Sequence, residues 1–585
     1  LGDSPKMAER FDDSVGSMIR RDRNHPSVVM WGLLNETSDG PVFKHAVSSL
    51  PFVRGLDRTR MVMLNSGRFD GQAETIGSLS NPGSEVWENV LSDLHPYRRV
   101  PHTAPIIEEF RTMGSEDRHA FISEYGIGSA VDLVQVTRHY EQLGKENVED
   151  ARFYRDKLNR FLEDWKAWGM AEVFGRPEDF FAESLRKMAG QRLLGLNAIR
   201  SNPHAVGYSL TGTVDQGMSG EGLFTTFREL KPGTVDAVFE GLAPVRWCLF
   251  AEPVNLNQGG EVGIEAVLAN EDAIQPGNYP VSFEIFDHDN NLVWERHLDF
   301  TIPERDSGNE PPLALPALKE SVHIDGLPGE YRFVASFDHG AAAAGGQTIF
   351  HVYSPLPLPL VENEVMLWGE DPPLSDWLND HGVKTRAFTP SEQTSREVIL
   401  TTYPPATPIT KETFQELLRH IARGSTAIFL VPDIFKKNSD LVGWLPLAQK
   451  GSLATLRGWL YHKDEWVKRH PIFEGLPTGM MDYSVYREVI PDVAWSGQDV
   501  PDEVVAGAND ASLAYSSGLM LSVYKLGEGR FILNTLRIRE NIGTDPVAEK
   551  LFANLLSYAA GESDQPLADS HEGFEETLKN LGFGE

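Results

Sequence analysis

Several features that would narrow the function are missing from this sequence of 585 residues. Its single cysteine, Cys248, cannot form a disulfide within the chain, so the redox compartment stays open. No segment approaches the roughly 18 unbroken apolar residues that a membrane span needs. The formal net charge is -32 and no run of lysine and arginine offsets it, so phosphate backbones and anionic lipids are repelled. We therefore expect neither a membrane span nor a nucleic-acid partner.

The beginning of the chain also lacks familiar signals. The segment LGDSPKMAER does not start with methionine and carries neither the basic nor the apolar part of a secretion signal. We expect a processed chain or a fragment whose upstream part is missing. Ser4 can cap a helix that has Pro5 at its first position, and apolar residues follow at helical spacing. The cellular location stays open, with a bacterial periplasmic or extracellular place favoured over the cytoplasm.

Strand and helix patterns alternate over residues 1–240. Such alternation is typical of βαβ units that build a parallel sheet. The apolar strand candidates lie at 28–34, 61–64, 89–97, 119–126 and 205–212. These are five strands, where a closed (β/α)8 barrel needs eight. The first 240 residues are therefore predicted to be the C-terminal part of such a barrel.

The pattern of apolar residues and turns changes twice in the rest of the chain. Short alternating strands with PGN and HDNN turns predict a β-sandwich of immunoglobulin-like size at 241–355. A proline-rich linker, SPLPLPLVENE, is followed by renewed βα alternation, which predicts a separate doubly wound α/β domain at 356–562. Residues 563–585 are acidic and weakly patterned, which predicts a tail with one marginal helix. The expected fold class is multidomain α/β plus β.

Two of the expected barrel strands end in a glutamate. The stretch RDRNHPSVVMWGLLNE ends at Asn35 and Glu36, and the stretch HAFISEYG carries Glu124. Because the carboxyl ends of barrel strands meet at one face, the two carboxylates would converge, and facing carboxylates are the apparatus of glycoside hydrolysis. From the spacing alone, an alternative carries equal weight: each glutamate could be a solvated carboxylate in a loop.

The same two stretches resemble glycoside hydrolase family 2. RDRNHPSVVMWGLLNE is similar to the acid/base signature of that family, and FISEYG is similar to its nucleophile strand. The resemblance covers about residues 1–240 and implies barrel strands four to eight. It also implies a retaining β-glycosidase with Glu36 as general acid/base and Glu124 as nucleophile. Asn35 would hydrogen-bond the 2-hydroxyl of the sugar.

Weaker candidates surround this pair. Tyr97 lies where strand six should end, and a tyrosine there hydrogen-bonds the nucleophile in the family; a half-buried loop tyrosine is the alternative. His95 could contact sugar hydroxyls or be a structural histidine. Asp215, after strand eight, could meet a sugar hydroxyl or stabilise a turn. Trp31 is expected to pack inside the barrel. The tryptophan usual in strand eight of the family is absent from AVGYSLTGT.

The resemblance and its departures define an expected substrate. A retaining mechanism places the carboxyl groups about 5 to 5.5 Å apart, where two charges repel by roughly 3 kcal/mol at an effective dielectric near 20. We therefore expect Glu36 to keep its proton while Glu124 is ionised. The loop TVDQGMSGEGLF lacks the Asn-x-Lys pattern that glucuronidases use, which favours a neutral sugar such as β-galactose in a β-linked oligo- or polysaccharide. No cofactor and no metal is expected.

The last α/β domain resembles the glutamine-amidotransferase-like domains appended to some glycosidases, through the phrase HPIFEGLP. Amidase chemistry would need a nucleophilic cysteine on a strand-to-helix elbow, whereas Cys248 lies in the expected sandwich. We therefore expect a non-catalytic module that serves binding or homo-oligomer assembly. Because three strands would be missing, we expect no activity from the chain by itself. The rival hypothesis is a non-catalytic carbohydrate-binding or scaffold protein with a vestigial barrel.

Overall fold

The computed structural model describes most of residues 4–584. Outside the described residues lie 1–3, 68–80, 85–87, 89, 216–218, 305–312, 356–363, 390–394, 403–408, 457, 459–462, 562, 564, 570–572 and 585. Most of the expected proline-rich linker therefore lies outside the described residues. Among the described helices, none is long and apolar enough to cross a membrane.

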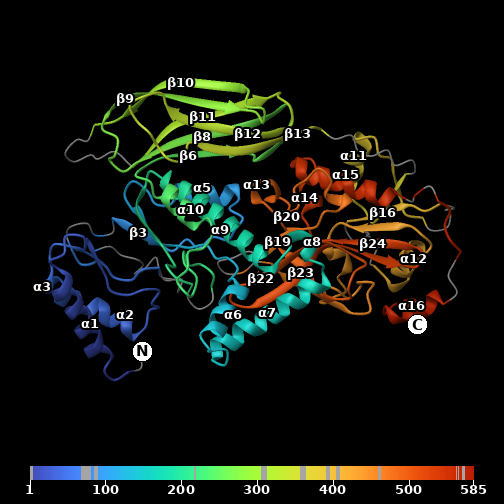
Figure 1. Ribbon diagram of the computed structural model, residues 1–585, viewed down its shortest axis with the longest axis horizontal. Coiled ribbons are helices and arrows are strands. Elements are labelled where there is room, and N and C mark those ends of the chain that lie inside the picture. The colour runs from blue at the N-terminus through green and yellow to red at the C-terminus, as the bar shows by residue number, and fades with distance from the viewer. Residues whose placement is uncertain are drawn as a thin grey trace.

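The first region, residues 4–241, contains two small parallel sheets with helices around them (Figure 1). One sheet pairs β1 (Met30–Gly32) with β2 (Met61–Met63), and the other has the order β3-β4-β5. The strands of the second sheet are β3 (Leu91–Leu94), β4 (His119–Tyr125) and β5 (Ala205–Leu210). The helices are α1 (Met7–Asp22), α2 (Pro41–Ser48), α3 (Leu50–Leu56), α5 (Ala104–Thr112), α6 (Leu133–Gln142), α7 (Glu149–Ala167), α8 (Ala171–Phe174), α9 (Pro177–Arg200) and α10 (Thr234–Gly241).

Local contacts explain two departures at the start of the chain. Helix α1 begins at Met7, two residues later than expected, because the Ser4 carbonyl accepts the Met7 N–H in a turn (3.0 Å) and no side chain caps the helix. Strand β1 is shorter than the apolar run that predicts it, since Val29 is 73% exposed. Trp31 is buried, and its indole N–H donates to Asp57 Oδ2 (3.0 Å), which confirms its packing role.

The second region, residues 245–353, consists of two sheets that face each other across a shared core. A five-stranded sheet has the order β10-β9-β12-β13-β7, and a three-stranded sheet has the order β11-β8-β6. The strands are β6 (Val245–Glu252), β7 (Asn255–Asn257), β8 (Gly260–Asn270), β9 (Gly277–Phe286), β10 (Leu292–Ile302), β11 (Ala314–Ile324), β12 (Gly329–Phe337) and β13 (Gln347–Tyr353). Strand β6 is buried on both faces because its outer face contacts α9, and burial raises the pKa of the Cys248 thiol in this strand to about 11.

The third region contains one large sheet that is parallel in one half and antiparallel in the other. The parallel half runs in the order β15-β14-β16-β17-β24, as expected for a doubly wound fold. Its strands are β14 (Val365–Trp368), β15 (Thr385–Ala387), β16 (Val398–Thr401), β17 (Thr426–Phe429) and β24 (Gly529–Asn534). The helices are α11 (Pro372–Asp380), α12 (Lys411–Ala422), α13 (Tyr483–Tyr486), α14 (Ile538–Asn541) and α15 (Pro546–Ala560), with short 3-10 turns at Pro432–Phe435 and Pro471–Phe473.

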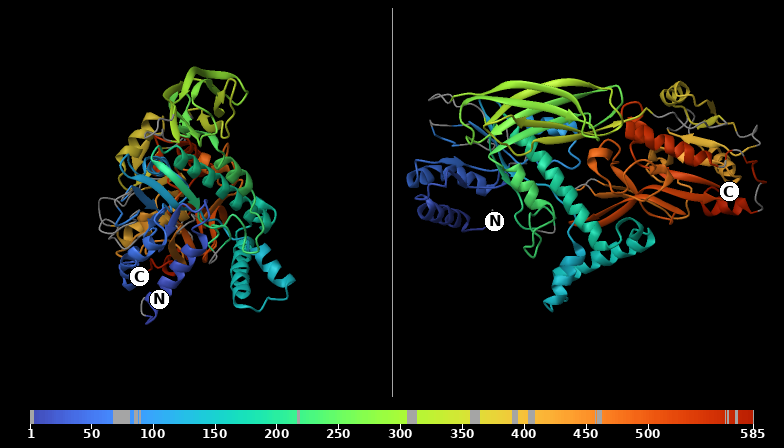
Figure 2. Two further views of the ribbon diagram at one scale, coloured as in Figure 1. Left: turned by 90° about the vertical axis from the view of Figure 1, so that its left-hand side faces the viewer. Right: turned by 45° about the horizontal axis from the view of Figure 1, so that its top comes forward.

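The antiparallel half was missed by the sequence analysis. Its strands are β18 (Lys450–Thr455), β19 (Asp464–Val467), β20 (Gly479–Met480), β21 (Val493–Gln498), β22 (Glu503–Ala511) and β23 (Tyr515–Leu526). This half packs against α6 to α9 of the first region, with Trp466 and Tyr515 in the same core as Phe161 and Phe180 (Figure 2). The third region therefore shares a core with the first, which corrects the expectation of a separate domain.

The C-terminal segment differs from the expectation in one respect. Residues 563–585 were expected to form an acidic tail with one marginal helix; the helix is present as α16 (Phe574–Asn580), but it is docked on the third region. Leu578 and Phe583 are buried beside Phe414 and Trp444. Phe574 and Leu581 pack against the same core, so four apolar side chains hold this short helix in place.

Candidate active site

Glu36 lies where β1 ends, in a backbone conformation that few residues adopt. Its φ is 48°, in the left-handed region that a non-glycine residue enters only at a cost. Pairing with the end of β2 holds it there, because the Glu36 N–H donates to the Ser66 carbonyl (2.7 Å) and Asn35 bridges to Ser66. The carboxyl group remains partly accessible, with 36% of the side chain exposed. The side chain of Glu36 therefore projects from the strained turn that follows β1.

Glu124 lies near the end of β4, and its side chain is 22% exposed. The hydroxyl of Tyr97, from the loop after β3, donates a hydrogen bond to Glu124 Oε2. Burial raises the pKa of Tyr97, and the hydrogen bond and charge of Glu124 raise it further, so the phenol stays protonated as a donor. The contact expected between these two residues is present.

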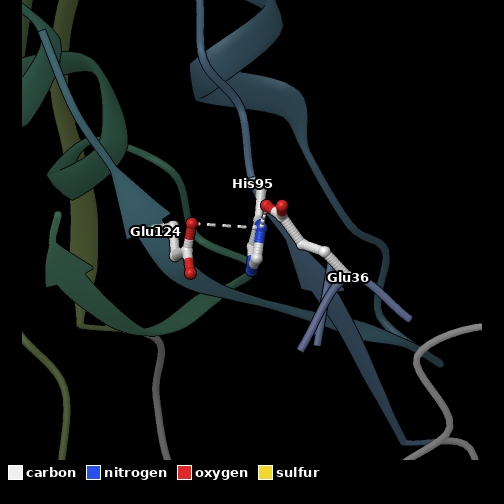
Figure 3. Close-up of side chains that lie close together, drawn as sticks. All are labelled: Glu36, His95 and Glu124. Atoms are coloured by element: carbon white, nitrogen blue, oxygen red, sulfur yellow. Dashed lines mark hydrogen bonds and ion pairs between the residues drawn. The ribbon is translucent and has the colours of Figure 1, made fainter. Parts of the chain in front are cut away.

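His95 joins the two glutamates. Its Nδ1 lies 2.7 Å from Glu36 Oε1 and 3.3 Å from Glu124 Oε2, and the ring is fully buried between them (Figure 3). The structure thus brings together two carboxylates that lie on different sheets of the first region. The sequence analysis left His95 open between a sugar contact and a structural role; it did not anticipate this bridge.

A hydrogen-bond network behind His95 fixes its tautomer. The Ser66 hydroxyl has one hydrogen, which it donates to Asp93 Oδ2 (2.8 Å), so His95 Nε2 (2.9 Å) must carry a hydrogen and donate it to Ser66. Nδ1 then faces Glu36 Oε1 at 2.7 Å, a hydrogen-bond distance that requires a hydrogen on one of the two atoms. Glu36 is therefore hydrogen-bonded to His95 through Nδ1.

Gly67 leaves the room that this ring occupies. A Cβ at this position would lie 2.0 Å from His95 Nδ1, so no larger residue fits without moving the ring. The Gly67 N–H also donates to Asp93 Oδ2 (2.9 Å). Residues 66 and 67, which follow β2, therefore hold the His95 ring in place.

The remaining predicted residues differ in placement. Asn35 is exposed next to Glu36 and bridges to β2 through its backbone. Asp215 is buried, with Oδ1 2.6 Å from Lys231 Nζ and 2.9 Å from the Gly222 nitrogen. These contacts account for Asp215 as a residue that stabilises the loop after β5, which was the alternative to a sugar contact.

The sequence analysis missed three further residues. Ser66 and Asp93 hold His95, and Glu221 is a third carboxyl whose pKa is raised by burial and further by the charge of Glu124. Ser66 and Asp93 lie at the ends of β2 and β3, so the rule that strand ends carry the chemistry could have found them. Glu221 lies in a loop among glycines, where no sequence signal marks it.

The same three side chains would be candidate metal ligands. One ligand atom from each of Glu36, His95 and Glu124 lies within 4.8 Å of the others. The hydrogen bonds described above already account for their proximity. The expectation of no metal and no cofactor stays a prediction.

Comparisons with known proteins find a family model that is similar to this region. Residues 1–159 match the description "Glycosyl hydrolases family 2, TIM barrel domain". Over these residues, the chain is similar to glycoside hydrolase family 2. A curated beta-galactosidase of Yersinia enterocolitica is 29% identical over 149 residues, which are 24% of this chain and 13% of that protein. The chain thus spans about an eighth of that relative.

Solved structures also match parts of the chain. An exo-chitosanase of Amycolatopsis orientalis matches 58% of this chain and 38% of its own, with 11% identity and a TM-score of 0.30. The beta-glucuronidase 2 of Bacteroides uniformis, in a structure covalently bound to cyclophellitol-6-carboxylate aziridine, matches 62% of this chain and 38% of its own, with 12% identity and a TM-score of 0.26.

Proposed function

We propose that the chain carries the reactive centre of a retaining β-glycosidase, which hydrolyses the O-glycosidic bond at the non-reducing end of a neutral sugar such as β-galactose. The observation that carries the proposal is the meeting of Glu36 and Glu124 on the buried ring of His95. The match of residues 1–159 to the family 2 barrel domain supports it independently.

The separation of the carboxylates favours the retaining mechanism. One oxygen of Glu36 and one of Glu124 lie within 4.8 Å of each other, and retaining enzymes hold their carboxyl groups about 5 to 5.5 Å apart, whereas inverting enzymes need room for a water between them. In the first step, Glu124 bonds the anomeric carbon while Glu36 gives its proton to the leaving oxygen. In the second step, Glu36 takes a proton from water, the water oxygen bonds the anomeric carbon, and Glu124 is released as a carboxylate.

Two neighbours position these groups. The Tyr97 hydroxyl hydrogen-bonds one oxygen of Glu124, which leaves the other oxygen for the attack. The hydrogen bond between His95 and Glu36 keeps a transferable proton on the side of the leaving group. Asn35, exposed beside Glu36, is placed to bind the 2-hydroxyl of the sugar. Asp215 is left out of this set because its carboxylate is occupied by Lys231.

The other regions receive supporting roles. We propose that β1 to β5 correspond to strands four to eight of a (β/α)8 barrel, and that the two facing sheets are an accessory immunoglobulin-like sandwich. The third region is proposed as a non-catalytic amidotransferase-like module. Its nearest possible thiol, Cys248, is buried in β6, which leaves no cysteine nucleophile for amidase chemistry.

The proposal is tested by hydrolysis of aryl β-galactosides with the protein at its natural length. Glu124→Gln should abolish turnover and leave folding intact, because it removes the nucleophile but preserves volume. Glu36→Ala should slow poor leaving groups most, since an activated aryl leaving group hardly needs a proton. Glu229→Gln, a loop carboxylate that pairs with His139, is the control. Turnover at the parent rate in both site variants would contradict the proposal; binding of sugars without hydrolysis by the parent would favour a carbohydrate-binding protein.

A further inference from the structure

A third carboxyl group, that of Glu221, belongs to a tightly packed loop after β5. The Glu221 carbonyl accepts a hydrogen bond from Arg192 (2.7 Å). A Cβ on Gly220 would lie 2.0 Å from the Ser129 carbonyl oxygen, and a Cβ on Gly212 would lie 2.6 Å from Glu221 Cγ. The glycines therefore let the loop approach its neighbours closely, and the direction of the Glu221 side chain is fixed by this packing.

The carboxyl group of Glu221 has no partner among the residues that the structure describes. The residue is only 8% exposed, yet its side chain makes neither a hydrogen bond nor an ion pair there. The nearby cations are engaged elsewhere, because Lys231 binds Asp215 (2.6 Å) and Arg192 binds backbone carbonyls. The carboxyl oxygens are not among the buried atoms that lack a hydrogen-bond partner, so they are open to hydrogen bonds from water or from a ligand.

The Glu221 side chain lies beside the end of β5, next to the strand that carries Glu124. Its Cγ lies against Gly212, and the neighbouring Thr211 N–H donates to the carbonyl of Tyr125 (2.9 Å), one residue after Glu124. Burial raises the pKa of Glu221, and the charge of Glu124 raises it further. The charge of Glu221 in turn contributes to the raised pKa of Tyr97. The side chain therefore borders the space that a sugar bonded to Glu124 would occupy, on the side of the loop after β5.

We propose that Glu221 hydrogen-bonds hydroxyl groups of the sugar in the site and selects neutral sugars against sugars that carry a carboxylate. This inference rests on the proposed function and names a residue that sets its specificity. A carboxyl oxygen accepts hydrogen bonds from sugar hydroxyls, so the substrate would supply the partner that the free protein lacks. The carboxylate of a uronic acid beside Glu221 would face like charge, worth roughly a 100-fold loss at an effective dielectric near 20.

The test compares Glu221→Gln with Glu229→Gln in the protein at its natural length. The kcat and KM are measured for an aryl β-galactoside and for the matching aryl β-glucuronide, and Tm is recorded for each variant. Glu221→Gln should lower kcat/KM for the galactoside about 10-fold or more, chiefly through KM, because a charged hydrogen bond becomes a neutral one. It should raise the ratio of glucuronide to galactoside activity at least about 10-fold, because the like charge is gone. Glu229→Gln should change neither quantity.

Equal losses on both substrates would overturn the proposal, because a merely structural role acts on both alike. An unchanged galactoside KM would overturn it as well. If the parent hydrolyses neither substrate, the proposed function fails, and the role of Glu221 is then decided by binding alone. In that case the Kd values of galactose and glucuronate are measured by calorimetry, and Glu221→Gln must still shift their ratio toward glucuronate.

Discussion

The first and third regions both contain parallel strands, but they use the polar residues at the strand ends in opposite ways. In the first region, Glu36 and Glu124 leave their strands with carboxylates that face each other and remain partly exposed. In the third region, Asp371 after β14 is paired with Arg539 (2.6 Å), at the point of the sheet where open α/β folds bind ligands. Asn534 at the end of β24 donates to the carbonyls of residues 430 and 536.

The difference shows that a polar side chain at a strand end indicates a reactive group only where neighbouring residues do not already bind it. In the third region the ion pair occupies this crevice position, which fits the non-catalytic role proposed for the region. Its residues nevertheless approach the site, because Arg487 and Arg537 line a surface pocket together with Tyr97. The two regions are therefore expected to respond differently to mutation, one in activity and the other in stability.

The largest effect is expected where the two regions join. Lys187 of α9 lies 3.2 Å from Asp464 and 3.1 Å from Glu465, whose side chains are fully buried. Lys187→Ala would remove the ammonium group that compensates both buried carboxylates, and it should lower the free energy of unfolding by about 3–5 kcal/mol in urea titrations. Lys319→Ala, which breaks a pair whose lysine is 80% exposed, should cost at most about 1 kcal/mol. Equal costs would mean that the regions are joined loosely.

The next effect separates activity from stability in the first region. His95→Gln keeps a hydrogen-bonding side chain but removes the imidazole that is hydrogen-bonded to Glu36. We expect kcat/KM for an aryl β-galactoside to fall about 100-fold, because general acid catalysis contributes at least that much. The loss should be larger for poor leaving groups than for activated ones. His139→Gln, which faces Glu229 at the surface, serves as the control. A loss independent of the leaving group would contradict a role for His95 at Glu36.

A substitution at the strand end of the third region should instead lower stability and leave activity unchanged. Asp371→Asn weakens the pair with Arg539 and should lower the free energy of unfolding by about 1–3 kcal/mol. The kcat and KM of the protein should stay at the parent values, because the paired crevice takes no part in hydrolysis. A change in kcat without a change in stability would show that this crevice is functional after all.

The smallest effect concerns pH. Asp545 caps α15, and burial raises the pKa of its carboxyl to about 7. A carboxyl whose pKa is higher in the folded state stabilises the fold below its unfolded pKa, and this stability is lost as pH rises to about 7. Asp545→Asn keeps the cap and should raise Tm at pH 8 by roughly 2 °C or more, with little change at pH 4. Asp482→Asn changes an exposed cap residue of α13 and is the control; it should not raise Tm at pH 8. If Asp545→Asn shifted Tm equally at both pH values, the link between the pKa of Asp545 and stability would be refuted.

Much of the first region could be predicted from local sequence. The run HAFISEYG predicts β4 at His119–Tyr125, and the motif around it led to the contact between Tyr97 and Glu124. The bridge through His95 could not be predicted, because it depends on how the ends of β1, β2 and β3 meet in space. Only the packing of Gly67 against the ring makes this arrangement possible.

The antiparallel half of the third region was missed for a physical reason. Strand β19 has the sequence DEWV, whose charged start is typical of a surface turn. Asp464 and Glu465 are nevertheless fully buried, because Lys187, far upstream in the chain, supplies the compensating charge. Local pattern cannot reveal a partner that only the tertiary fold brings close. A marginal helix was expected near α16, but its docking through Leu578 and Phe583 escaped prediction in the same way.

The central claim is that Glu124 forms a covalent bond with the sugar while Glu36 supplies the proton. It is tested most directly by incubating the protein at its natural length with an activated 2-fluoro-β-galactoside and mapping the adduct by peptide mass spectrometry. The account predicts one 2-fluoro-galactosyl group on Glu124, absent in Glu124→Gln and retained in Glu36→Ala. An adduct on any other residue, or its persistence in Glu124→Gln, would contradict it.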